Sequence, residues 1–279
     1  MKRSLTAVLG IMCITMLSCQ KEVKDIFSNN GNTGGSGSTG SGLLTRITSS
    51  SGTDSSSLTF GYNSSKKLIS LVTEAFTGGQ KVTLSERAVR DAQGVIQQVI
   101  YKSPVYAQFG LDSAVSIIKS SGGKYIAEVT TLNVGGIPLV DSIALIYDAT
   151  GKVIREEQYT SILGMTDKSG KTEYTYNGNN LATLNNYSWD GTTFNLDETY
   201  TYDQYDAKLS PMYFGAEAFV FGSQEFVSQN NPTKSTLTMV GTTENYTTTY
   251  TYNSSNKPIS ATSVVQPSGV VARGNYYYQ

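Results

Sequence analysis

The stretch Tyr200-Thr201-Tyr202-Asp203 reads YTYD, and four near copies of this tetrad recur along the chain. The copies are YTYN at 174–177 and 250–253, FGYN at 60–63 and LIYD at 145–148. On a strand the first and third side chains share a face, and the closing Asn or Asp starts a turn by bonding its own backbone two residues on. An apolar residue, such as Leu68 or Val153, follows each turn at a near-constant distance. Each copy therefore predicts a β-hairpin.

The hairpins repeat with a period of about 27 residues, which holds two strands and their turns. Tyr147 and Tyr176 are 29 residues apart, and Tyr176 and Tyr202 are 26 apart. Weaker copies lie at 90–95, near 118–119 and near 227–228. Only 216–226 has a weak helical period. The pattern predicts an all-β fold, a long antiparallel meander of about 15–17 strands over 43–279.

The copy Tyr147–Val153, which reads YDATGKV, resembles the YD-type repeat of Rhs and teneurin-like β shells. The chain as a whole is similar to Bacteroidota lipoproteins of unknown function that are built from YD-like hairpins. It departs from Rhs proteins in its longer period and in ending without a toxin or protease domain. We therefore expect a curved single sheet or half-barrel rather than a closed shell. The resemblance transfers no catalytic residue.

The repeated tyrosines have a structural interpretation. Equivalent residues of neighbouring hairpins lie side by side in a meander, and aromatic pairs across strands contribute about 0.2–1 kcal/mol each. We expect the equivalent tyrosines to form a ladder on one face of the sheet, mostly covered. They are Tyr62, Tyr147, Tyr176, Tyr202 and Tyr252. Exposure of the same rings would instead favour a sugar-binding strip.

Composition excludes several classes of function. The net charge of -1 gives no cationic cluster for phosphates, so we expect no nucleic-acid partner. The chain has no histidine, which removes His-based nucleophile triads and most zinc sites. No Gly-rich loop opens onto a helix to hold a phosphate. We expect no cofactor, no metal and no enzymatic activity.

The N-terminus is typical of an exported precursor. Lys2 and Arg3 precede an apolar run at 5–17, which has the length of a signal peptide. Ser18-Cys19 at its end resembles a bacterial lipobox, with Met16 where leucine is usual. The resemblance implies that residues 1–18 are removed and that Cys19 is acylated and held in outer-membrane lipid. An ordinary secretory signal with a chance cysteine is the alternative.

Residues 19–42 are expected to be the lipidated cysteine followed by a flexible linker. The run SNNGNTGGSGSTGSG at 28–42 has almost no apolar atom and cannot offset its ordering entropy. The charged segment at 20–25 resembles the export signal of Bacteroidota surface lipoproteins. It favours the outer face of the outer membrane over the periplasmic side.

Trp189, the only tryptophan, lies beside the Asp190-Gly191 turn with Tyr187 on the same parity. These two rings form a candidate ligand platform for a glycan or a protein. Closure of the edge of the core is the structural alternative, and we favour it for an aromatic residue in this position.

Other candidate sites are carboxylates and modification motifs. Asp203 with Asp206, or Asp197 with Glu198, could flank a glycosidic bond or hold a calcium ion, although solvated turn charges are the favoured interpretation. Asp112-Ser113-Ala114 and Asp141-Ser142-Ile143 match the O-glycosylation pattern of exported Bacteroidota proteins, with Ser113 and Ser142 as acceptors.

Three functional classes fit these features. They are a surface binding or adhesion lipoprotein, a carboxylate-based glycan hydrolase, and a transmembrane β-barrel. The barrel requires an outward apolar band, whereas one face of the key strands carries Thr, Ser, Gln and Glu. The hydrolase lacks a paired-carboxylate motif on a recognisable scaffold, and a purely structural envelope protein is a further alternative. The sequence favours a non-catalytic binding or adhesion lipoprotein of the outer membrane that faces the exterior.

Overall fold

The computed structural model describes residues 42–279, apart from 52–53, 78–79 and 108–109. In chain order its elements are β1 (Leu44–Ser51), β2 (Asp54–Tyr62), β3 (Leu68–Thr77), β4 (Gln80–Arg90), β5 (Ile96–Lys102), α2 (Pro104–Ala107), β6 (Ala114–Ser121), β7 (Lys124–Val134), β8 (Ile137–Tyr147), β9 (Val153–Ile162), β10 (Met165–Asn177), β11 (Asn180–Trp189), β12 (Phe194–Leu209), α3 (Glu217–Val220), η1 (Gln224–Val227), β13 (Asn230–Met239), β14 (Thr242–Tyr252), β15 (Pro258–Gln266) and β16 (Val270–Tyr278). The signal peptide, Cys19 and the linker up to residue 41 lie outside the described residues.

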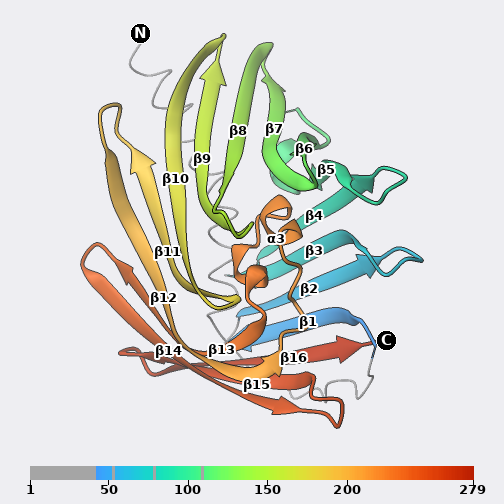
Figure 1. Cartoon of the computed structure of the whole chain (residues 1–279), viewed down its shortest axis with the longest axis vertical. Helices are drawn as coiled ribbons and strands as arrows, with labels where there is room; N and C mark the ends of the chain where they lie inside the picture. Colours follow the sequence, from blue (N-terminus) through green and yellow to red (C-terminus); the bar gives the residue numbers. More distant parts are fainter. Residues whose placement is uncertain (1–41, 52–53, 78–79, 108–109) are drawn as a thin grey trace.

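Each strand pairs antiparallel with its sequence neighbours, and β16 returns to pair with β1, so the sheet closes into a barrel of 16 strands (Figure 1). The antiparallel meander and its number of strands are confirmed. The expected curved single sheet or half-barrel is wrong. Ile47 opposes Tyr276, and Ser50 opposes Arg273, across the closing pair. Twist accumulates from strand to strand until the two edges meet, which is a global property that the repeat does not encode.

The closing residue of the tetrad organises the turn. Asn63 Oδ1 accepts the backbone N–H groups of Ser65 and Lys67, at 3.0 and 2.9 Å. Asp91, Asp148 and Asn253 repeat this pair of bonds two and four residues on. We call the end of the barrel with these turns the turn end and the opposite end the far end. At these positions the side chain of the recurring Asn or Asp caps a tight turn. Asp203 of the YTYD copy lies within β12, so the hairpin predicted directly after that copy is wrong.

The predicted tyrosines all lie on the inner side of the wall and are half-buried. Contact with the preceding hairpin runs through a hydroxyl group: Tyr147 donates to the carbonyl of Tyr125 at 2.6 Å, and Tyr176 to that of Val153 at 2.7 Å. Tyr205, Tyr250 and Tyr278 make the same bond to Leu181, Pro232 and Pro258. These bonds join hairpins around the turn end, and of the predicted tyrosines Tyr147 and Tyr176 belong to the series, with Tyr205, Tyr250 and Tyr278 as its other members.

The connection between β12 and β13, residues 210–229, folds into the interior and forms a plug with α3 and η1 (Figure 1). The helical period at 216–226 predicts this element. Phe219 contacts Tyr174 at 5.2 Å between ring centroids, and Phe226 contacts Phe60 at 6.3 Å. The core thus lies between the plug and the inner side of the wall.

The outer side of β14 is polar. On β14, alternate residues are exposed, and the outward set consists of Thr243, Asn245, Thr247, Thr249 and Thr251. Threonine suits this position because its branched side chain favours a strand and its hydroxyl faces water. No helix among the described residues has the length and apolar character needed to cross a membrane.

Candidate functional site

The predicted platform lies on the outer side of the barrel, at the far end of the β11–β12 hairpin. Trp189 opposes Phe194, and Tyr187 opposes Leu196, across this hairpin. The rings of Trp189 and Phe194 lie 4.8 Å apart between centroids at 56°. The structure therefore brings Trp189 and Tyr187 onto one surface and adds Phe194, which the sequence interpretation missed. The signal for Phe194 was its position directly across the Asp190-Gly191 turn.

Two lysines of β10 complete this surface. Lys168 Nζ lies 5.2 Å from the Trp189 ring and 5.5 Å from the Phe194 ring, and Lys171 Nζ lies 4.3 Å from the Tyr187 ring. Lys171 is also paired with Glu173 at 2.6 Å. Cations over aromatic faces hold the rings in place and contribute about 0.5–1 kcal/mol each at exposed sites. We call Trp189, Phe194, Tyr187, Lys168 and Lys171 the Trp189 surface.

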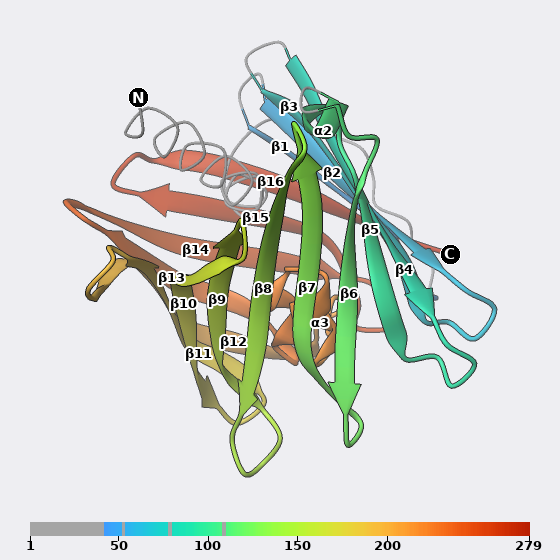
Figure 2. The ribbon, with the colours of Figure 1, turned by 90° about the horizontal axis from the view of Figure 1, so that it is seen from above.

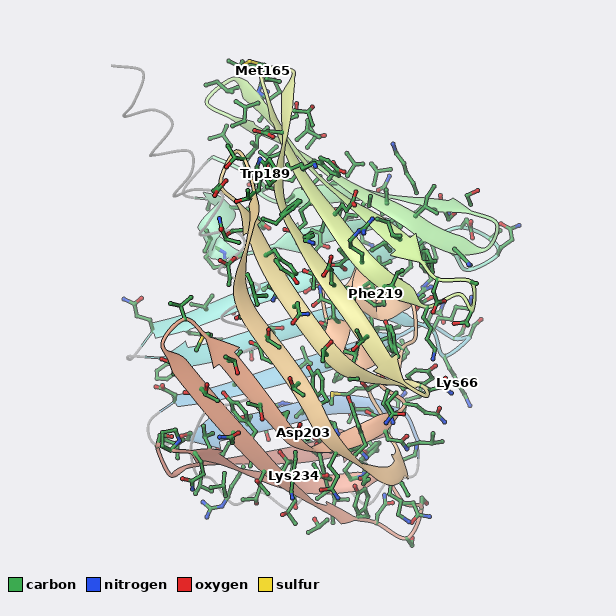
Figure 3. All side chains as sticks on the ribbon, turned by 60° about the vertical axis from the view of Figure 1, so that its left-hand side comes forward. Lys66, Met165, Trp189, Asp203, Phe219 and Lys234 are labelled. Carbon is green, nitrogen blue, oxygen red and sulfur yellow. The ribbon has the colours of Figure 1, made fainter. Side chains whose placement is uncertain are left out.

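The Trp189 surface is accessible. Trp189, Tyr187 and Phe194 are each partly exposed, and Met165, on the neighbouring hairpin tip, is 73% exposed. Figure 3 shows Met165 and Trp189 toward one end of the barrel, with Lys66 toward the other. The Nε1 atom of Trp189 is buried and has no hydrogen-bond partner among the described residues, so the residue offers its ring rather than its N–H group.

The register does not support the favoured interpretation of Trp189 as closure of the core. Trp189 shares the outer side with Tyr187, whereas the interior clusters contain Leu181 and Leu184 from the same strand. The register with β10 skips Ala182, so the alternation of β11 shifts there: Leu181 and Leu184 both face the interior, and Tyr187 and Trp189 face outward.

The candidate carboxylate pairs have separate hydrogen-bond partners. Asp197 is exposed and accepts from Ser188 at 2.9 Å, whereas Glu198 is buried and accepts from Asn186. The two carboxylates of the first pair therefore differ in partner and in exposure.

The two carboxylates of the second pair also differ in their partners. Asp203 is exposed and accepts from Thr236 at 3.2 Å, while Asp206 accepts from Asn231 at 3.1 Å and from Tyr252. No group of three or more carboxylates that could hold a metal ion gathers among the residues that the structure describes.

The plug has its own anchor in Arg90 of β4, whose side chain is 6% exposed. Arg90 donates to both carboxylate oxygens of Glu217 at 2.8 Å and to the carbonyls of Leu68 and Gly94. Tyr125 O–H also reaches Glu217, at 3.4 Å. The sequence interpretation missed this anchor because residues 90 and 217 are distant in the chain and belong to no shared motif.

The two candidate glycosylation serines lie in different settings. Ser113 is half-buried in the connection before β6. Ser142 is half-buried within β8, opposite Val129 and Tyr159 of the neighbouring strands. Modification of either serine stays a prediction.

Comparison with known proteins adds a likeness of fold. No family model and no curated protein sequence matches the chain. The crystal structure of a porin-like protein from Bacteroides uniformis is similar, with a TM-score of 0.55 at 12% identity, over 85% of this chain and 98% of that one. A porin-like protein from Bacteroides vulgatus gives 0.51 at 13% identity, over 85% and 99%. The shared feature is the all-antiparallel barrel.

Proposed function

We propose that this chain is a non-catalytic binding or adhesion lipoprotein of the cell envelope, held in outer-membrane lipid by acylated Cys19 and facing the exterior. Its ligand is a glycan or another extended polymer that contacts the Trp189 surface. One observation carries this proposal: a cluster of aromatic rings, with lysines over their faces, lies on the outer side of the barrel wall. Such rings present flat apolar faces to the C–H faces of a sugar.

The polar outer side of β14 supports a barrel that stands outside the bilayer. A transmembrane barrel needs an apolar band around its whole outer circumference. The outward Thr243, Thr247 and Thr251 would face hydrocarbon there. The plug, fixed by Arg90 and Glu217, further supports a role other than that of an open pore. The Bacteroides source of both porin-like structures agrees with the resemblance to Bacteroidota lipoproteins.

The test is affinity electrophoresis of the full chain, carrying Cys19→Ser, through a panel of neutral and acidic polysaccharides. Trp189→Ala should weaken binding by about tenfold, because one aromatic contact contributes about 0.5–1.5 kcal/mol beyond its buried area. Tyr213→Ala is the matched control, since Tyr213 is an exposed aromatic residue on the plug connection rather than on the Trp189 surface. Equal retention of parent and Trp189→Ala by every ligand would contradict the proposal and favour a purely structural envelope protein.

A further inference from the structure

The strand β6 is apolar on both sides of the wall. Its inward residues Ala114, Ser116 and Ile118 are buried, as a core requires. Its outward residues are Val115, Ile117 and Lys119, and the first two are 37% and 44% exposed. β14 carries threonine and asparagine at the equivalent outward positions. The outward positions of β6 therefore carry large apolar side chains, although β14 shows that polar side chains fit outward positions of this barrel.

Neighbouring strands extend this apolar area. Ile100 of β5 opposes Val115, and Val129 of β7 opposes Ile117. On β8, the outward Val140 continues the area next to Thr131. Figure 2 shows β6, β7 and β8 side by side along one flank of the barrel. A contiguous exposed apolar area marks a surface that contacts a partner or a membrane. We call it the β6 face.

The outward charges of β4, β5 and β6 beside the β6 face are cationic, and Asp112, exposed in the connection before β6, is an acidic neighbour. Arg87 is exposed beside Ile100, while Lys102 and Lys119 are exposed on β5 and β6. The carboxylates of these strands, Glu86 of β4, Glu128 of β7 and Asp141 of β8, lie on the inner side. None of the ion pairs among the described residues involves Arg87, Lys102 or Lys119.

We propose that the β6 face docks on an anionic phospholipid surface, with its apolar side chains at the acyl boundary and its three cations among the headgroups. Peripheral membrane surfaces combine these two features, an apolar strip and flanking Lys or Arg. A second copy of the chain fits less well, because a face-to-face pair would bring like charges together.

This docking goes beyond the proposed function and needs neither acyl chain nor glycan. Docking orients the barrel so that the flank that carries β5–β8 faces the lipid surface. The Trp189 surface belongs to β10–β12, which follow β9 around the barrel, and so lies on a different part of the wall. Docking on the β6 face therefore leaves the ligand surface open to solvent.

The experiment is vesicle flotation of the full chain carrying Cys19→Ser, with neutral phosphatidylcholine vesicles and with vesicles that contain phosphatidylglycerol. The N-terminal segment is common to every variant, so the measured quantity is the preference for anionic over neutral vesicles. Arg87→Gln with Lys102→Gln and Lys119→Gln should lower this preference at least tenfold, since each charge near an anionic surface contributes a factor of about five.

The matched control is Arg46→Gln with Lys234→Gln and Arg273→Gln, which removes three exposed charges on other strands and has the same net charge. It should lower the preference by about twofold or less. A second variant, Val115→Thr with Ile117→Thr, keeps β propensity and should reduce binding to anionic vesicles with unchanged unfolding.

Three outcomes would overturn the proposal. They are equal losses in the two charge variants, no preference of the parent for anionic vesicles, or a parent dimer in sedimentation that Val115→Thr with Ile117→Thr converts to a monomer while vesicle binding is unchanged. The last outcome would assign the β6 face to a second copy of the chain. Loss of glycan binding in Trp189→Ala is measured separately, so failure of one proposal does not imply failure of the other.

Discussion

Lys66 occupies the one turn position where the repeat departs from its own rule. The fourth residue of each Asx-capped turn has positive φ, at 78° for Gly94 and 89° for Gly151, and Asn256 has 59°. Lys66 adopts φ of 60° at the same position, although a side chain with Cβ is strained there. The geometry of the turn therefore imposes a positive φ on Lys66, although lysine favours negative φ.

We expect Lys66→Gly to stabilise the protein by about 1 kcal/mol. Glycine removes the steric cost of a side chain at left-handed φ, and the larger conformational entropy of glycine in the unfolded chain offsets part of this gain. The measurement is urea denaturation followed by circular dichroism. Gly151→Ala is the mirror control and should destabilise by a similar amount, since it introduces the same strain. A lower midpoint for Lys66→Gly would show that the lysine makes a compensating contact.

Glu128 lies on the inner side of β7, where burial raises the pKa of its carboxyl group and a hydrogen bond from Tyr101 only partly opposes the rise. A carboxyl group whose pKa is higher in the folded state favours folding most below its unfolded pKa of about 4.3. That contribution is lost as pH rises through the folded pKa. The buried charge is therefore a cost at neutral pH.

Glu128→Gln should accordingly raise the melting temperature at pH 7 and change it little near pH 4, where the parent side chain is already protonated in the unfolded state. The check is a series of thermal melts between pH 4 and 8. Glu74→Gln serves as control. Glu74 is paired with Lys81 at the surface, and this hydrogen-bonded cation lowers the pKa of the Glu74 carboxyl group instead of raising it. A gain that is constant across pH would show that ionisation is not its cause.

At the level of elements, the plug is held by few but well-placed contacts. The carboxylate of Glu217 is 26% exposed and meets the buried guanidinium of Arg90, which also bonds two carbonyls at the turn end. Removing one member of a buried pair is strongly destabilising because the other charge stays behind without compensation. The desolvated Arg90 thus makes the position of α3 depend on Glu217.

Glu217→Gln should lower the free energy of unfolding by about 2–3 kcal/mol, somewhat less than a fully buried pair would lose. Glu157→Gln breaks the Arg155–Glu157 pair on the outer wall, whose side chains are 40% and 32% exposed, and should cost under about 1 kcal/mol. The free energy of unfolding of both variants is to be measured by urea denaturation. Equal losses in the two variants would mean that Arg90 finds another partner when Glu217 is neutral.

At the scale of the whole molecule, the placement of the barrel depends on residues outside those described. The acylated Cys19 is expected to hold the protein in lipid through several acyl chains, which give stable anchoring where one chain would not. The parent protein should leave the membrane fraction only with detergent, whereas a high-salt wash should release Cys19→Ser from the membranes. High salt is used because it screens the attraction of Arg87, Lys102 and Lys119 to lipid headgroups.

The check is fractionation of cells that produce the parent or the variant, followed by immunoblotting. Ser18→Ala is the control, since a small residue before the cysteine retains the lipobox pattern. Recovery of Cys19→Ser in the salt-resistant membrane fraction would count against a lipoprotein.

Much of the architecture could be predicted because it is local. Except at Asp203, where β12 continues, the tetrad places two side chains on one face and a turn after them, so the hairpins, the antiparallel meander and the inward tyrosines follow from residues within one period. The helical pattern at 216–226 likewise predicts α3 and η1. The Asp190-Gly191 turn and the shared parity of Tyr187 and Trp189 predict one common surface.

Only the tertiary structure decided whether the sheet closes into a barrel and on which side of the wall Trp189 lies. Whether β16 meets β1 depends on twist and stagger summed over every strand, to which each repeat contributes little. The outward position of Trp189 depends on a one-residue bulge at Ala182, which shifts the alternation of β11 between Leu181 and Leu184. The Arg90–Glu217 anchor joins residues 127 positions apart, and only the folded chain brings their charges together out of water.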